Sequence, residues 1–172
     1  MASFTDLNDE DFFPPWEHLP GHVYLDGPSP FYHSEDNGGD SRSGTGHRYT
    51  PKRHWCFLGE IESYERFMRC RTVVKDDFDR KYIIAFYLDD SNAFDSSKLR
   101  EGHTMAVMYA HQHAFADGTC GVRVENPDYV RIFPIGHQEL EWLSTAMQEY
   151  GKPTDGKWKC HGCDKLVDAG SE

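Results

Sequence analysis

The sequence predicts a mainly β fold: a partly open barrel of five or six short antiparallel strands, with a short helix before the fourth strand and a helix after the last. Three observations predict it. Runs rich in β-branched and aromatic residues follow one another between acidic or glycine-containing turns. A segment typical of one helical turn interrupts this series, and a longer helical pattern follows it.

The expected strands begin at Trp55, where the composition changes. They span residues 55–64, 67–76, 81–90, 103–113, 119–125 and 129–134. The second shows the clearest alternation, since successive strand side chains point to opposite faces. We therefore expect Met68, Cys70, Thr72 and Val74 to face inward.

Two segments are expected to be helical. Residues 91–102 fit about one turn that Gly102 ends, and residues 136–152 carry an apolar stripe at helical spacing that ends at Gly151. The stripe consists of Leu140, Leu143, Ala146 and Met147. The second helix is expected to cap an open end of the barrel, with Trp142 and Met147 as packing residues.

This order of elements over residues 54–150 is similar to the OB-fold, a partly open Greek-key barrel. A helical turn and a glycine ahead of the fourth strand favour that interpretation. An SH3-like barrel or a small sandwich remains an alternative.

Three segments flank the predicted barrel. Residues 1–33 form an acidic arm rich in aromatic residues and proline, expected either to pack on its own domain or to bind a partner. Residues 34–53 lose their hydrophobicity and are expected to be a disordered linker. Residues 151–172 form a polar tail with two cysteines.

Charge and composition narrow the classes of partner. The chain has 29 acidic and 18 basic residues, a net charge of −11, which disfavours long-range attraction to nucleic acid or to anionic lipid. No secretory signal and no long apolar run is present, so a cytoplasmic or nuclear protein without a membrane partner is expected. Five cysteines in such a protein fit free thiols and metal ligands.

Cys160 and Cys163 are the predicted metal ligands. Their C-x-x-C spacing lets both thiolates bind one tetrahedral zinc ion, although zinc requires two further ligands. A redox disulfide and two unstructured thiols are the alternatives. The zinc site is therefore predicted to be incomplete, and it could be unoccupied.

The stretch from "REGHTMAVMYAHQHAFADGTCGVRVE" to "KWKCHGCDKL" resembles a family of fungal proteins in which a β-rich region precedes a MYND-type zinc finger. The resemblance implies that Cys160 and Cys163 match the first pair of the finger. It also implies a non-catalytic protein-interaction module with a protein partner. Because the remaining ligands of that finger have no counterpart before Glu172, we expect a fragment whose finger cannot close.

A single-stranded nucleic-acid binder is the alternative function. One cluster combines cations with rings, as the exposed sheet face of an OB-fold does when bases stack on it. The cluster consists of Tyr64, Arg66, Phe67, Arg69, Arg71 and Tyr82. Ion pairs between these arginines and Glu60, Glu62 and Glu65 are the simpler explanation of the same pattern.

His111 and His113 form a weaker candidate site. They lie two apart on an expected strand end, so they share a face and could chelate a metal together with Asp117. Hydrogen-bonded histidines beside a turn at Asp117 and Gly118 are the favoured interpretation. The sequence carries no phosphate-binding loop, nucleophile elbow or H-E-x-x-H motif, so we predict that it is not an enzyme.

Overall fold

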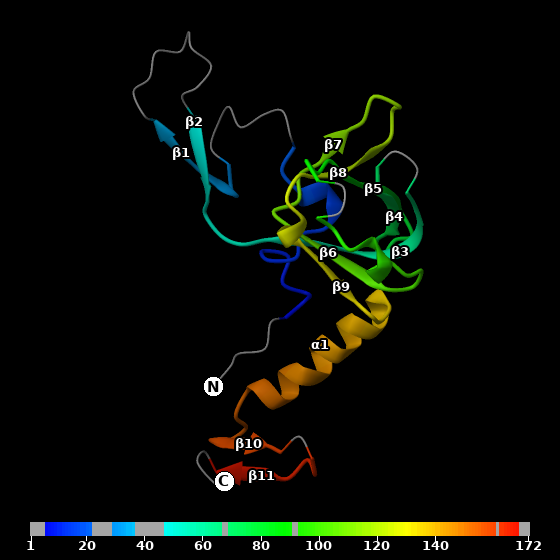
Figure 1. Cartoon of the computed structure of the whole chain (residues 1–172). Coiled ribbons are helices and arrows are strands. Elements are labelled where there is room, and N and C mark those ends of the chain that lie inside the picture. Colours follow the sequence, from blue (N-terminus) through cyan, green and yellow to red (C-terminus); the bar gives the residue numbers. More distant parts are fainter. Residues whose placement is uncertain are drawn as a thin grey trace.

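The structure is a computed structural model that describes residues 6–21, 29–36, 47–66, 69–90, 93–160 and 162–168. It confirms a mainly β fold built on one mixed seven-stranded sheet (Figure 1). The order of its strands is β7-β8-β5-β4-β3-β6-β9. Their bounds are Cys56–Glu65 (β3), Arg71–Lys75 (β4), Lys81–Phe86 (β5), Thr104–Met108 (β6), His113–Ala114 (β7), Cys120–Val124 (β8) and Val130–Phe133 (β9).

Strand β3 bends the sheet into an open, OB-like barrel. Its first half pairs with β6 and its second half pairs with β4, both antiparallel. At the other side β5 pairs with β8 in parallel, from Ile83 opposite Gly121 to Phe86 opposite Val124. The prediction that all strands are antiparallel is therefore wrong for this pair. Strands β6 and β7 lie between β5 and β8 in the sequence, so the two are not joined by a hairpin and can pair in parallel.

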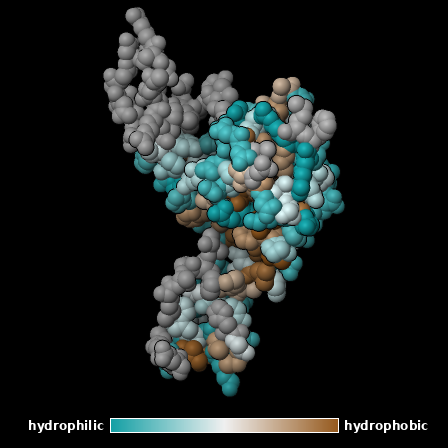
Figure 2. All heavy atoms as spheres, in the orientation of Figure 1, coloured by the Kyte–Doolittle hydropathy of each residue, from teal (hydrophilic) through white to brown (hydrophobic). Residues whose placement is uncertain are grey.

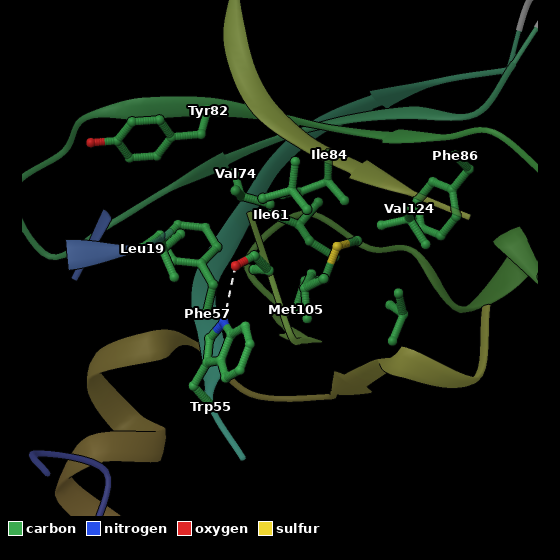
Figure 3. Close-up of a cluster of buried hydrophobic side chains, with 14 of the residues drawn as sticks. Leu19, Trp55, Phe57, Ile61, Val74, Tyr82, Ile84, Phe86, Met105 and Val124 are labelled. Atoms are coloured by element: carbon green, nitrogen blue, oxygen red, sulfur yellow. Dashed lines mark hydrogen bonds between the residues drawn. The ribbon is translucent and has the colours of Figure 1, made fainter. Parts of the chain in front are cut away.

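The core lies inside the bend of the sheet (Figure 3). Trp55, Ile61, Ile84 and Met105 are almost fully buried there, and the indole Nε1 of Trp55 donates a hydrogen bond to the carbonyl oxygen of Ala110 at 2.9 Å. The predicted inward set is confirmed for Thr72 and Val74 of β4, which are buried, whereas Arg71 and Val73 are only half-buried. Cys70, just before β4, is half-buried and packs against the core, and Met68 lies outside the described residues.

The N-terminal arm packs on its own domain. After a short 3-10 helix, η1 (Trp16–His18), the chain runs beside β7, where Gly21 bridges Gln112. Trp16 stacks on Tyr82 with 4.1 Å between ring centroids and meets Phe57 edge-on. Of the two expectations for the arm, packing is the one that these residues follow.

A second small sheet lies where the linker was expected. Strands β1 (Tyr32–Asp36) and β2 (His47–Pro51) form an antiparallel hairpin, and Tyr32 packs edge-on against Trp55. The prediction of a disordered linker over residues 34–53 is therefore wrong for the end of β1, residues 34–36, and for β2. The most polar part of that stretch, residues 37–46, lies outside the described residues.

Helix α1 (His137–Gly151) follows β9, as expected. At its first residue, Glu60 of β3 accepts a hydrogen bond from the His137 amide at 3.0 Å and also pairs with Lys75. Burial by itself opposes ionisation of Glu60, but these two partners outweigh it and lower the pKa of its carboxyl group. A carboxylate at a helix N-terminus stabilises the helix, so β3 fixes where α1 starts.

The rest of α1 does not cap the barrel. It runs away from the sheet toward the hairpin of β10 (Lys157–Lys159) and β11 (Leu166–Asp168) (Figure 1). Trp142 is 66% exposed and Met147 is also exposed, so the prediction that both are packing residues is wrong. Among the described residues, no helix is long and apolar enough to cross a membrane.

Two further 3-10 helices complete the domain. One of them, η2 (Ser96–Lys98), confirms the expected helical turn before the fourth predicted strand. Its N-cap is Asp95, whose carboxylate accepts a hydrogen bond from the Ser97 amide. The other, η3 (Pro127–Tyr129), joins β8 to β9.

Candidate nucleic-acid interface

The candidate site is the outer face of the β4, β5 and β8 strands, opposite the core. Side chains alternate between the two faces of a strand, so the residues next to each buried residue point outward. Arg71 of β4 lies opposite Ala85 of β5, which in turn lies opposite Arg123 of β8. Two arginines therefore flank a small alanine in one row across three strands.

The next row supplies an apolar floor. Val73, Ile83 and Gly121 are partners across the same three strands. A Cβ atom at Gly121 would lie 1.8 Å from the carbonyl oxygen of Ile83, so only glycine permits the close approach of β5 and β8 here. The face thus combines an apolar row, Val73, Ile83 and Gly121, with a row that carries the cations of Arg71 and Arg123.

Aromatic rings lie beside the arginine row. The guanidinium groups of Arg69 and Arg123 lie 4.0 and 4.5 Å from the centroid of the Tyr87 ring. Tyr87 also lies parallel to Phe115, with 6.4 Å between centroids, and Arg71 lies 5.6 Å from the centroid of Phe115. These are cation–π contacts, and surfaces that bind single strands combine such cations with aromatic rings on which bases stack.

Asp117 holds Arg71 in place. Its carboxylate accepts two hydrogen bonds from the Arg71 guanidinium, both at 3.0 Å. The hydroxyl and the amide of Thr119, followed by Arg71, lower the pKa of Asp117 to about 2. Arg71 is consequently oriented, but part of its charge is neutralised.

A cavity of about 350 Å³ opens beside this face. Arg69, Tyr87 and Arg123 line it together with Phe94 and Ser96 from the segment around η2. Its wall carries two arginine guanidinium groups and the carboxylate of Asp89, together with three aromatic residues, Phe86, Tyr87 and Phe94. Such a cavity suits a planar polar group that can both stack and accept hydrogen bonds.

The structure divides the predicted cluster. Arg69 and Arg71 lie on the face, whereas Arg66 lies 5.7 Å from the ring centroid of Tyr64 and donates to the carbonyl oxygen of Ser96. Phe67 lies outside the described residues. Placing Tyr82 on an exposed face is wrong, because its side chain points into the core and only 7% of the residue is exposed (Figure 3).

The alternative explanation was that Glu60, Glu62 and Glu65 pair with the arginines of the cluster. Two of these glutamates have other partners. Glu60 pairs with Lys75 and Glu62 pairs with Lys81, at 3.2 and 2.6 Å. These acidic residues on β3 therefore have lysine partners.

Tyr87, Phe115 and Arg123 were missed by sequence reasoning. For Arg123 and Tyr87 the signal was present, because alternation along 81–87 and 119–125 puts both outside. Nothing in the sequence pattern indicated that Phe115, which lies between β7 and the turn at Asp117 and Gly118, would reach the same place.

The C-x-x-C pair lies in the turn of the β10–β11 hairpin. The Cys160 amide donates to the Lys165 carbonyl oxygen, and the Asp164 amide donates to that of Cys160. Hydrogen bonds from the Gly162 amide and then from Cys163 lower the pKa of the Cys160 thiol, which favours the thiolate that zinc requires. In the part of the chain that is described, these cysteines belong to no group of three or more candidate metal ligands.

His111 and His113 are engaged separately. The ring of His111 stacks on Tyr32, and its Nε2 atom lies 2.7 Å from the tyrosine hydroxyl. His113 meets Phe115 edge-on, while Asp117 binds Arg71 and Thr119. The structure therefore does not bring the two histidines and Asp117 together as a metal site.

An apolar groove of about 680 Å³ lies on another side of the molecule. Residues of α1, the arm and strands β3, β6 and β9 form its walls. Exposed residues of α1 and β9, including Phe133, Leu143 and Met147, line it. In Figure 2, hydrophobic residues gather where α1 leaves the body of the sheet.

Comparisons with known proteins find no matching family model and no matching curated protein. The solved structures that match this chain include the following two. The S. pombe Stn1–Ten1 complex matches with 13% identity and a TM-score of 0.41, covering 58% of this chain and 70% of that chain. A replication protein A heterotrimer bound to single-stranded DNA matches with 10% identity and a TM-score of 0.36, covering 66% and 80%.

The function expected from the MYND resemblance is corrected by these findings. No family model of any kind matches, and the two structures reported are the Stn1–Ten1 complex and a single-stranded DNA complex of replication protein A. The prediction that this chain is a MYND-type interaction module is wrong. The chain is, by its own sheet order, an open OB-like β domain.

Proposed function

We propose that the outer face of β4, β5 and β8 binds single-stranded nucleic acid. The observation that carries this proposal is the row of Arg71, Ala85 and Arg123, with Tyr87 held under two guanidinium groups beside it. In OB-folds this part of the sheet is where oligonucleotides lie. A base would stack on Tyr87 in place of one of the two guanidinium groups, and Arg69, Arg71 and Arg123 would contact phosphates.

The acidic charge of the chain fits a local rather than a long-range mode of binding. A net charge of −11 repels a polyanion at a distance, so affinity has to come from contacts at the face itself. Stacking contributes about 1–3 kcal/mol per base and does not depend strongly on sequence. Binding without marked sequence preference is therefore expected.

The proposal is tested by fluorescence anisotropy with a labelled oligo(dT) and a duplex of equal length. We expect binding to the single strand at low salt, weaker binding to the duplex, and a salt slope of about −2, corresponding to roughly three phosphate contacts. Failure to bind the single strand at low salt would contradict the proposal.

Asp117→Asn is expected to increase affinity for the single strand by about two- to fivefold, the size of one exposed ion pair. The variant removes the charge that neutralises Arg71 but keeps an oxygen that can accept from Thr119. Asp128→Asn, an equal charge change before β9, is the control and is expected to have little effect. Equal gains in both variants would show that net charge alone matters.

Two expectations from the sequence continue as proposals beside this one. The first is a protein partner, for which the groove lined by Phe133, Leu143 and Met147 offers apolar surface. The second is zinc bound by Cys160 and Cys163, with other ligands supplied from elsewhere, supported by the lowered pKa of the Cys160 thiol. Catalysis plays no part in the proposed function.

A further inference from the structure

Three potential metal ligands meet at the start of α1, away from the proposed nucleic-acid face. His137 and Glu141 lie one turn apart on the helix, and Asp77 lies in the turn between β4 and β5. One ligand atom of each residue lies within 4.8 Å of the others. Within the described residues this is the one group of three or more side chains able to hold an ion.

The fold fixes the positions of all three. The hydrogen bond from the His137 amide to Glu60 ties the start of α1 to β3. Asp76 organises the β4–β5 turn, since its carboxylate accepts from the amides of Phe78 and Arg80. The neighbouring Asp77 is thereby held against α1, with its Oδ1 atom 2.9 Å from Nδ1 of His137.

The His137 ring carries a buried nitrogen atom without a hydrogen bond. Its side chain is only 8% exposed, and Nδ1 has no hydrogen-bond partner within the described part of the chain. The contact with Asp77 is close enough for an ion pair but is not aligned as a hydrogen bond. A buried polar atom without a hydrogen bond costs free energy. With the ring proton on Nε2, the lone pair of Nδ1 is available to a cation.

The two carboxyl groups also favour a shared cation. The ligand oxygens of Asp77 and Glu141 lie within 4.8 Å of one another. Two carboxylates this close repel unless a proton or a metal ion lies between them. The start of a helix disfavours a cation, but the carboxylate of Glu60 on the His137 amide offsets that effect.

A cavity of about 230 Å³ adjoins the three residues, which all line it. Trp16, Phe57 and others from the arm and β3 form the remainder of its wall. A site with three protein ligands and an adjacent cavity leaves room for a water molecule or a small anion as the fourth ligand.

We propose that Asp77, His137 and Glu141 bind one divalent transition-metal cation. One imidazole nitrogen with two carboxylates suits zinc and its neighbours, whereas magnesium and calcium prefer sites made of oxygen alone. The site is separate from the thiolate pair at Cys160 and Cys163, and it does not depend on the proposed nucleic-acid binding.

The test uses zinc as the probe and the full chain with Cys160→Ser and Cys163→Ser, so that thiolates cannot compete. After treatment with a chelator, native mass spectrometry and calorimetric titration are expected to show one zinc ion per chain. Adding Glu141→Gln is expected to lower the zinc affinity at least tenfold. Glu139→Gln, the same charge change at an exposed position of α1, is the control and is expected to retain it.

Thermal unfolding separates loss of the site from loss of the fold. Zinc is expected to raise the melting temperature of the cysteine-free chain and of its Glu139→Gln form, but not of its Glu141→Gln form. Without metal, Glu141→Gln is expected to melt no lower than its parent, because the repulsion from Asp77 is removed. No zinc uptake by the cysteine-free chain, or equal uptake by both glutamine variants, would overturn the proposal.

Discussion

Arg123→Glu is expected to reduce affinity for a single-stranded oligonucleotide by tenfold or more. Arg123 belongs to the arginine row of the face and also contacts the Tyr87 ring, so the change removes a phosphate contact and adds repulsion. Hydrogen bonds to charged groups contribute about 1.5–3 kcal/mol, which corresponds to tenfold or more in affinity. The salt slope is expected to become less steep by about 0.7, the contribution of one phosphate contact with a single strand.

Arg131→Glu is the matched control for this variant. Arg131 is exposed on β9, at the opposite edge of the sheet, and its guanidinium donates to backbone carbonyl oxygens. Both variants change the net charge by the same amount, so an equal loss of affinity would show that the face has no special role. Anisotropy titrations at several salt concentrations measure both quantities.

Gly121→Ala is expected to destabilise the domain by about 3 kcal/mol or more, because overpacking against rigid atoms is poorly relieved. The new Cβ atom would lie 1.8 Å from the oxygen and 2.7 Å from the carbon of the Ile83 carbonyl group. Backbone atoms cannot rotate away as a side chain would. The parallel pairing of β5 and β8 therefore has to separate, and with it the alignment of Arg123.

Urea unfolding measures this loss, with Gly21→Ala as the control. Nothing lies within 4 Å of a Cβ atom at Gly21, and that glycine needs no positive φ. The control is expected to unfold close to the parent chain. A Gly121→Ala variant that unfolds at the same urea concentration as Gly21→Ala would contradict the described pairing of β5 with β8.

Much of the sheet could be predicted because its pattern is local. Alternation along β4 placed Thr72 and Val74 inside, and the apolar runs located every strand of the large sheet. The fourth run, however, divides into β6 and β7 at Tyr109, which adopts a φ of 54°. The Tyr109 amide donates to the carbonyl oxygen of Trp55, so a distant contact supports this uncommon conformation, and a sequence pattern cannot reveal it.

The candidate site was predictable only in part. Arg69 and Arg71 were found because they are near one another in the sequence. Tyr82 was wrongly predicted to be exposed. It lies two residues before Ile84 on β5, so both side chains point into the core, but the cluster was predicted from residue types and not from the alternation along the strand. Asp77 and His137 are 60 residues apart and meet only because Glu60 anchors the start of α1 beside the β4–β5 turn.

The most direct test of the central claim is an NMR map of amide shifts in the protein during titration with a short oligo(dT). We predict that the largest shifts lie in β4, β5 and β8 and around Tyr87 and Phe115, with little change along α1. Shifts confined to α1 or to the β10–β11 hairpin, with the outer face of the sheet unchanged, would contradict the proposed site.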